Sequence, residues 1–196
     1  MLRRNSFSYL GKGEAMSGTE EFDAKLGAVN LDEIIILLVN SDDGPHWTYE
    51  QARGVELWYR RFHRVLYLSD YRAVVPTKRV DEFWHYHILD TRKYHEDCYN
   101  MHGRFVHHFP YLGMKGEDDV KRLGLEYNRT RLLFLEAFGE DPGLVEKLFS
   151  GTDKEVAALC GDCGSDDIEF SRLTVSEINC KIANMSDRNV ASLEVR

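Results

Sequence analysis

The chain has 196 residues, a length that suits one domain with tails or at most two small domains. Its formal net charge of −8 argues against binding to nucleic acid or to an anionic membrane through the overall field. Hydrophobic residues make up 43% of the sequence, enough for a core, and the ten Tyr, ten Phe and three Trp predict that aromatic rings fill much of it.

The sequence also bears on the compartment. It has no run of 18 apolar residues, so we expect no transmembrane helix and no membrane partner. The first residues include two arginines but no apolar segment, unlike a secretory signal. The cysteines are too sparse for a disulfide scaffold: Cys98, Cys160, Cys163 and Cys180. We therefore expect a cytoplasmic protein.

Composition divides the chain into three parts. Residues 1–28 are polar and rich in Gly and Ser, and are expected to form a flexible N-terminal segment. Residues 29–150 carry periodic apolar patterns and are expected to form a helical, histidine-rich core domain. Residues 151–196 read as a polar C-terminal tail. The predicted fold is mainly α: a compact helical domain with a histidine-rich helix-break-helix and polar, partly disordered tails.

The first expected elements of the core are two helices. The stretch "LDEIIILLVNS" (31–41) reads as a short buried helix, although its β-branched residues also allow a strand. A long amphipathic helix is expected from Thr48 onward. Its three-four spacing predicts one buried stripe: Val55, Trp58, Tyr59, Phe62, Val65 and Leu66.

Two shorter helices are expected next. One should open after Pro76, with Thr77 as its N-cap. A break at "LDT" then allows Asp90 or Thr91 to cap a second helix, which should end at Gly103.

After a loop, the segment 117–139 is expected to form a further helix, ended by Gly139, and "PGLVEKLF" a short helical turn. The inner face of the long helix is predicted to comprise Val120, Leu123, Tyr127, Thr130, Leu133, Phe134 and Phe138.

Histidines are concentrated in one part of the chain. The sequence has eight, and these fall between residues 85 and 108: His85, His87, His95, His102, His107 and His108. On a regular helix, His85 and His87 diverge by about 200° and cannot bind one metal ion together. We therefore predict that the helix loosens at or just after His87, and that His108 approaches from the loop after Gly103.

Two further readings of these residues stay open. His95, Cys98 and His102 share one helical stripe and offer the N, S and N donors that transition metals accept. Cys98 could equally be a small buried side chain, and His87, on an apolar face, one tied up by a hydrogen bond.

The stretch from Val75 to Phe109 resembles the glycine-rich domain-containing protein-like family, and the resemblance extends over about residues 48–140. That family's pattern contains a W-H-x-H block followed by a tyrosine, a cysteine, a glycine and a later histidine. The matching residues are Pro76, Val80, Asp81, Trp84, His85, His87, Tyr94, Cys98, Gly103 and His108. His107 takes a position that is acidic in the family.

The resemblance implies that His85, His87 and His108 are the main site candidates, with Cys98 next. It also implies that His95 and His102 are surface residues particular to this sequence. A proline that the family often has where this chain has Thr91 supports the helix break. The chain lacks the family's long glycine-rich tail and appended RNA-binding domain, and the resemblance implies no particular activity.

Other motifs are weaker. The "CGDC" motif (Cys160 to Cys163) has no second cysteine pair and no βαβ context, so it weakly indicates a metal or redox site. A cysteine protease that pairs Cys98 with His108 would also need an oxyanion-hole motif, and the sequence shows none. No phosphate-binding or dinucleotide-binding fingerprint is present.

The favoured hypothesis is a cytoplasmic metal-binding protein of unassigned activity that holds zinc or iron; an open coordination position on the ion would allow an accessory or tailoring metalloenzyme. Its predicted metal ligands are His85, His87, His108 and Cys98, and the further candidates are His107, Asp81, Trp84 and Tyr94. The alternative is a non-catalytic module with structural histidines that binds a protein or peptide partner. The sequence does not indicate whether the protein is monomeric or oligomeric.

Overall fold

The structure, a computed structural model, describes residues 18–42 and 44–150. These residues form helices and no strand, which confirms the mainly α prediction. The elements are α1 (Gly18–Ala28), α2 (Asp32–Asn40), α3 (Tyr49–Leu68), α4 (Lys78–Leu89), α5 (Thr91–His102), α6 (Glu117–Phe138) and a 3-10 helix, η1 (Pro142–Phe149). None of the described helices is both long and apolar enough to cross a membrane.

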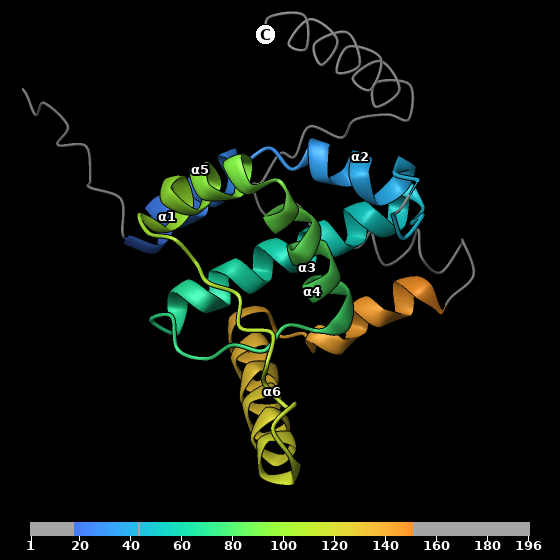
Figure 1. The fold of residues 1–196 in the computed structure, drawn as a ribbon. Coiled ribbons are helices and arrows are strands. Elements are labelled where there is room, and N and C mark those ends of the chain that lie inside the picture. Colours follow the sequence, from blue (N-terminus) through green and yellow to red (C-terminus); the bar gives the residue numbers. More distant parts are fainter. Residues whose placement is uncertain (1–17, 43, 151–196) are drawn as a thin grey trace, which may run out of the picture.

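Helix α3 is the centre of the fold. Figure 1 shows it running through the middle of the molecule, with α1, α2 and α5 on one side and α6 and η1 on the other. Thr48 begins it with a capping box: its side chain accepts from the Gln51 N–H, and the Gln51 side chain accepts from the Thr48 N–H.

The buried stripe predicted for α3 is confirmed. All six of its members are at most 8% exposed: Val55, Trp58, Tyr59, Phe62, Val65 and Leu66. The segment 31–41 contributes α2, a helix rather than a strand, whose Ile34, Ile35 and Leu38 are fully buried. Aromatic rings bring α3 and α4 together, with centroids 4.8 Å apart for Tyr59 and Phe83 and 5.1 Å for Phe62 and Trp84.

The expected flexible segment is corrected over residues 18–28, because these residues form α1. Phe22 and Leu26 of α1 are buried, and the Phe22 ring stacks on Tyr67 of α3. The buried Arg60 guanidinium donates to the Leu26 carbonyl at 2.6 Å and to the Val29 carbonyl at 2.8 Å. These bonds satisfy the carbonyls at the end of α1, where a helix favours a cation. Residues 1–17 and 151–196, including the CGDC motif, lie outside the described residues, and the three-part division stays a prediction.

The break between α4 and α5 lies where the sequence predicts it. The Asp90 side chain accepts from the Lys93 N–H and caps α5, and Gly103 ends α5 with a φ of 66°. However, α4 remains helical to Leu89, so the predicted loosening at or just after His87 is wrong. With Asp90 capping the next helix, the chain turns without unwinding the end of α4.

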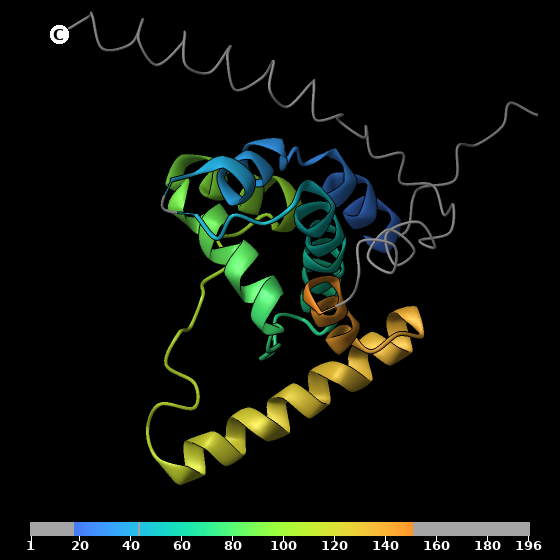
Figure 2. The same cartoon turned by 90° about the vertical axis from the view of Figure 1, so that its right-hand side faces the viewer.

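The inner face predicted for α6 is only partly correct. Thr130 and Phe134 are buried, but Val120 is 54% exposed, and the remaining predicted members are half-buried. Figure 2 shows the reason: the first half of α6 extends past the other helices. The periodic pattern shows which residues share a face of the helix, but it does not show how much of that face the rest of the protein covers.

A buried polar chain links α3 to α5. His63 is fully buried, and its Nδ1 lies 2.8 Å from Nε2 of His102, whose Nδ1 lies 3.0 Å from the Tyr71 hydroxyl. His63 Nε2 has no hydrogen-bond partner. Burial lowers the pKa of His63 well below its usual value, and burial, followed by the Arg104 charge, lowers the pKa of His102 to about 4.

These shifts predict acid sensitivity. Between about pH 6.5 and pH 4 the unfolded chain binds more protons at the two histidines than the folded protein does, so the free energy of unfolding should fall as the pH falls through this window. We expect a loss on the order of 2 kcal/mol, measured by urea unfolding at a series of pH values. His102→Gln should make the dependence less steep, and His95→Gln, at an exposed position on α5, should not. An equally steep profile in both variants would contradict this assignment.

Candidate metal centre

Helix α4 places two polar side chains one turn apart on its outer face. Asp81 and His85 are four residues apart, a spacing that puts side chains next to each other on a helix. Their side chains are 35% and 50% exposed, and His85 Nδ1 lies 3.7 Å from Asp81 Oδ2. An i, i+4 pair of this kind can chelate one ion from a regular helix, as the two histidines of a helical HExxH motif do.

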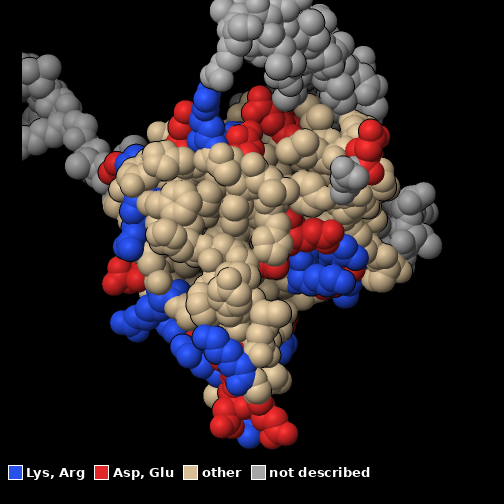
Figure 3. All heavy atoms as spheres, in the orientation of Figure 1, with Lys and Arg blue, Asp and Glu red and all other residues tan. Residues whose placement is uncertain are grey.

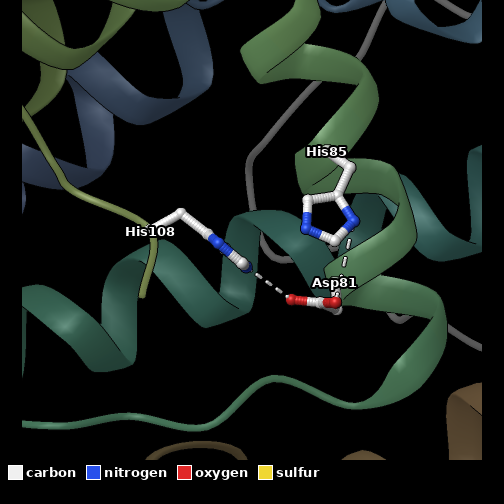
Figure 4. Close-up of side chains that lie close together, drawn as sticks. All are labelled: Asp81, His85 and His108. Carbon is white, nitrogen blue, oxygen red and sulfur yellow. Dashed lines mark hydrogen bonds and ion pairs between the residues drawn. The ribbon is translucent and has the colours of Figure 1, made fainter. Parts of the chain in front are cut away.

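The third member of the group comes from the segment that follows α5. His108 Nε2 lies 2.9 Å from Asp81 Oδ1, and because a carboxylate accepts, the imidazole N–H donates. The His108 and His85 rings are 4.6 Å apart between centroids. Figure 4 shows both imidazoles directed toward the Asp81 carboxylate. One donor atom from each of the three residues can be chosen so that all lie within 4.8 Å of one another.

The position of His108 is set by buried contacts behind it. The Trp84 ring packs against His108 with centroids 4.7 Å apart. The Trp84 Nε1–H donates to the Tyr94 hydroxyl at 2.8 Å, which in turn donates to the Val106 carbonyl at 2.6 Å. These two hydrogen bonds attach the segment before His108 to α4 and α5. Trp84 and Tyr94, both predicted as site candidates, therefore lie behind the group and position it.

The group has the donor set of a transition-metal site. Two imidazole nitrogens and one carboxylate are ligands that zinc accepts, and they also form the facial triad of non-haem iron sites. Metal–ligand bonds of about 2.0–2.2 Å require donor atoms about 3–3.5 Å apart, so the group must tighten around an ion. His85 can supply this movement because half of its side chain is exposed.

His87 faces the opposite way. It is fully buried, with Nδ1 2.8 Å from the Tyr59 hydroxyl and Nε2 2.9 Å from Asp97 Oδ2. Lys93 Nζ donates to the same Asp97 oxygen at 2.8 Å. Both ring nitrogens of His87 are thus engaged inside the protein, and the structure does not bring this residue to the group of Asp81, His85 and His108.

The charges of this network follow from burial. Burial lowers the pKa of His87 despite the opposing hydrogen bond to Asp97. Burial would raise the pKa of Asp97, but hydrogen bonds from His87 and Lys93 lower it overall. Burial raises the pKa of Tyr59 well above its usual value. A neutral imidazole therefore accepts from the Tyr59 O–H at Nδ1 and donates from Nε2 to the carboxylate.

The other predicted residues also lie apart from the group. Cys98 is fully buried beside Tyr94 and the backbone of Val106, and burial raises the pKa of its thiol. His107 is exposed and packs against Phe105, with centroids 4.8 Å apart. The His95 ring is tilted against the Tyr99 ring, with centroids 4.8 Å apart. The predicted metal roles of His87 and Cys98 stay predictions that this geometry does not favour.

Sequence reasoning ranked Asp81 below the histidines, although the group depends on it. The available signal was its i, i+4 spacing to His85, together with the absence of any helix-breaking residue between the two. His63 was not singled out, because the sequence around a histidine in an apolar stripe does not show which buried side chain it contacts.

The family comparison corrects the resemblance drawn from the histidine block. The sequence model of the UCP032817-like family, an uncharacterised family, matches residues 37–128, and the glycine-rich domain-containing protein-like family is not supported. The match spans α3, α4 and α5, and so includes all three residues of the candidate metal centre. No curated protein and no solved structure matches the chain significantly.

We predict that His87 is a structural residue. His87→Ala leaves the buried Asp97 and Tyr59 groups without their shared partner and opens a cavity, so the free energy of unfolding should fall by about 3 kcal/mol. The loss should be the same with and without chelator, as measured by urea unfolding.

His95→Ala, at an exposed position on α5, provides the control, with a change within about 0.5 kcal/mol. A destabilisation of His87→Ala that disappears in the presence of chelator would instead make this residue a ligand.

Proposed function

We propose that the protein binds one transition-metal ion, zinc or iron, through Asp81, His85 and His108. The observation that carries the proposal is the convergence of one carboxylate and two imidazole donors, all within 4.8 Å of one another, from two separate segments of the chain. The buried bonds from Trp84 and Tyr94 support it, because groups that fix the orientation of metal ligands raise affinity.

Three protein ligands leave coordination positions open to solvent. Asp81 and His85 are partly exposed, so a small molecule can reach an ion held between them. An ion with open positions acts as a Lewis acid or activates a bound water. We therefore favour an accessory or tailoring metalloenzyme that acts in the cytoplasm over a purely structural site, which would have a closed ligand set.

A second candidate is a protein or peptide interaction module. The observation that favours it is the hydrogen bond between His108 and Asp81, which already joins the segment after α5 to α4 without an ion. In that case the group is a structural clamp, and the histidines contribute packing and hydrogen bonds.

Metal content separates the two functions. Tag-free protein should bind about one equivalent of zinc, or of iron after anaerobic Fe(II) loading, measured by elemental analysis following gel filtration. Its melting temperature should fall on addition of chelator, because binding energy adds to folding energy. Less than about a tenth of an equivalent under both loading conditions would overturn the metal proposal.

Variants then locate the site. Asp81→Asn, His85→Ala and His108→Ala should each lower metal content, and their melting temperatures should respond less to chelator than that of the wild type. His107→Ala is the matched control, because His107 is exposed, adjoins His108 in sequence and lies outside the group. Equal metal content in all four variants would place the ion elsewhere.

A further inference from the structure

The candidate metal centre offers three protein ligands, one fewer than a closed site needs. Asp81, His85 and His108 each supply one donor atom, and among the described residues no fourth side chain joins this group. A zinc site in which every ligand is a protein side chain is tetrahedral and has four. If the protein holds an ion here, as proposed above, the remaining position is open to water, to a substrate or to a part of the chain outside the described residues.

The described chain ends close to this centre. Figure 1 shows η1 beside the start of α4, and the two helices are in contact. The Arg79 guanidinium of α4 lies 3.9 Å from the centroid of the Phe149 ring, and the Arg79 N–H donates to Glu146 at 3.2 Å. Arg79 precedes Asp81 by two residues, about 200° around the helix. The chain that continues beyond Ser150 therefore has to cross only the width of α4, about 10 Å, to reach the ligands.

The first cysteines beyond Ser150 are within reach of the centre. Cys160 and Cys163, the pair in the CGDC motif, follow Ser150 by ten and thirteen residues. Ten residues span at most about 33 Å, roughly three times the distance to be crossed. Because the pair is attached to the same chain, its local concentration at the centre is on the order of 1 mM.

The motif also has donors that suit the open position. A thiolate is a common zinc ligand, and residues 1–17 and 43 contain neither cysteine nor histidine. A divalent ion held by one carboxylate and two neutral imidazoles keeps a net positive charge. The sequence on both sides of the motif is acidic and so complements this charge: Asp153, Glu155, Asp162, Asp166, Asp167 and Glu169, against the single Lys154.

The surface near the end of the described chain does not oppose an acidic segment. Figure 3 shows basic and acidic side chains together on the side of the molecule where η1 lies in Figure 1. Arg79 is paired there with Glu82 and with Glu146, and Lys78 is exposed beside it. These charges balance one another, so the field that acts on the chain beyond Ser150 is set mainly by the bound ion.

We propose that a thiolate of the CGDC motif binds the ion in its fourth position and closes the centre. The thiol releases its proton to solvent when the bond between sulfur and metal forms. Since Asp81, His85 and His108 hold the ion from the folded core, the sulfur can leave without loss of the metal. A substrate or water must displace it to reach the ion, so the C-terminal segment controls access to the proposed metalloenzyme. A thiolate among the ligands also favours zinc over hard cations.

Cobalt(II) tests for the sulfur ligand, because a thiolate bound to this ion adds a near-ultraviolet charge-transfer band that nitrogen and oxygen ligands do not give. The 196-residue protein loaded with one equivalent of cobalt(II) should show the band. Cys160→Ser/Cys163→Ser should lose the band and still bind cobalt through the other three ligands, about a hundredfold more weakly. Cys180→Ser, which changes a cysteine outside the motif, is the control and should keep the band.

Substitutions in the core show whether the sulfur and the centre share one ion. Asp81→Asn/His85→Ala should abolish the band, and His107→Ala should leave it unchanged. A band that persists in the double variant means that the motif binds cobalt by itself, which overturns the proposal. A wild type that binds one equivalent without the band overturns the closure and leaves the proposed metal site standing, whereas a wild type that binds no cobalt overturns both.

The sulfur should come from the same chain as the other ligands. Sedimentation velocity should give the same oligomeric state with and without cobalt, because a tethered ligand reaches the ion without a second copy. Association that appears only with the ion would assign the thiolate to a second copy and overturn closure within one chain.

Discussion

The hydrogen-bond chain from Trp84 through Tyr94 to the Val106 carbonyl fixes the histidine-rich part of the molecule. It joins α4, α5 and the segment after α5 at a point where water cannot replace a lost partner, so each of these polar groups must be paired. The Trp84 ring also contacts Phe62 of α3 and His108. The segment therefore leaves α5 along a defined path, which brings His108 to Asp81 rather than into solvent.

Regular helix geometry gives the two histidines of the W-H-x-H block different tasks. Because α4 stays helical to Leu89, His85 and His87 diverge: His85 is half exposed beside Asp81, and His87 is fully buried beside Tyr59. The candidate ligand pair on this helix is formed by residues four apart, and residues two apart instead connect its outer face to the core. The buried His87 helps to stabilise the scaffold that holds the exposed pair.

Local signals predicted most of the fold. Caps at Thr77 and Asp90 and the glycines that end helices are read directly from neighbouring residues, which explains why those boundaries were confirmed. The contact between His108 and Asp81 and the partner of His87 depend on how α4 and α5 are oriented relative to each other, which no local pattern specifies. The same limit applies to α1, because the bonds from Arg60 that secure it come from a helix more than 30 residues later in the chain.

An ion at the candidate metal centre must replace contacts that the protein already makes there. At the centre, polar atoms converge but already satisfy one another, since Asp81 accepts from His108. An ion must therefore bind more strongly than the hydrogen bond it replaces, which favours a metal with high affinity for imidazole over a weakly bound hard cation. The segment between α5 and α6, which carries His108, ends where the Asp119 carboxylate accepts from the Gly113 and Lys115 N–H groups. These bonds anchor the far end of that segment to the first turn of α6, so its two ends are held by separate contacts.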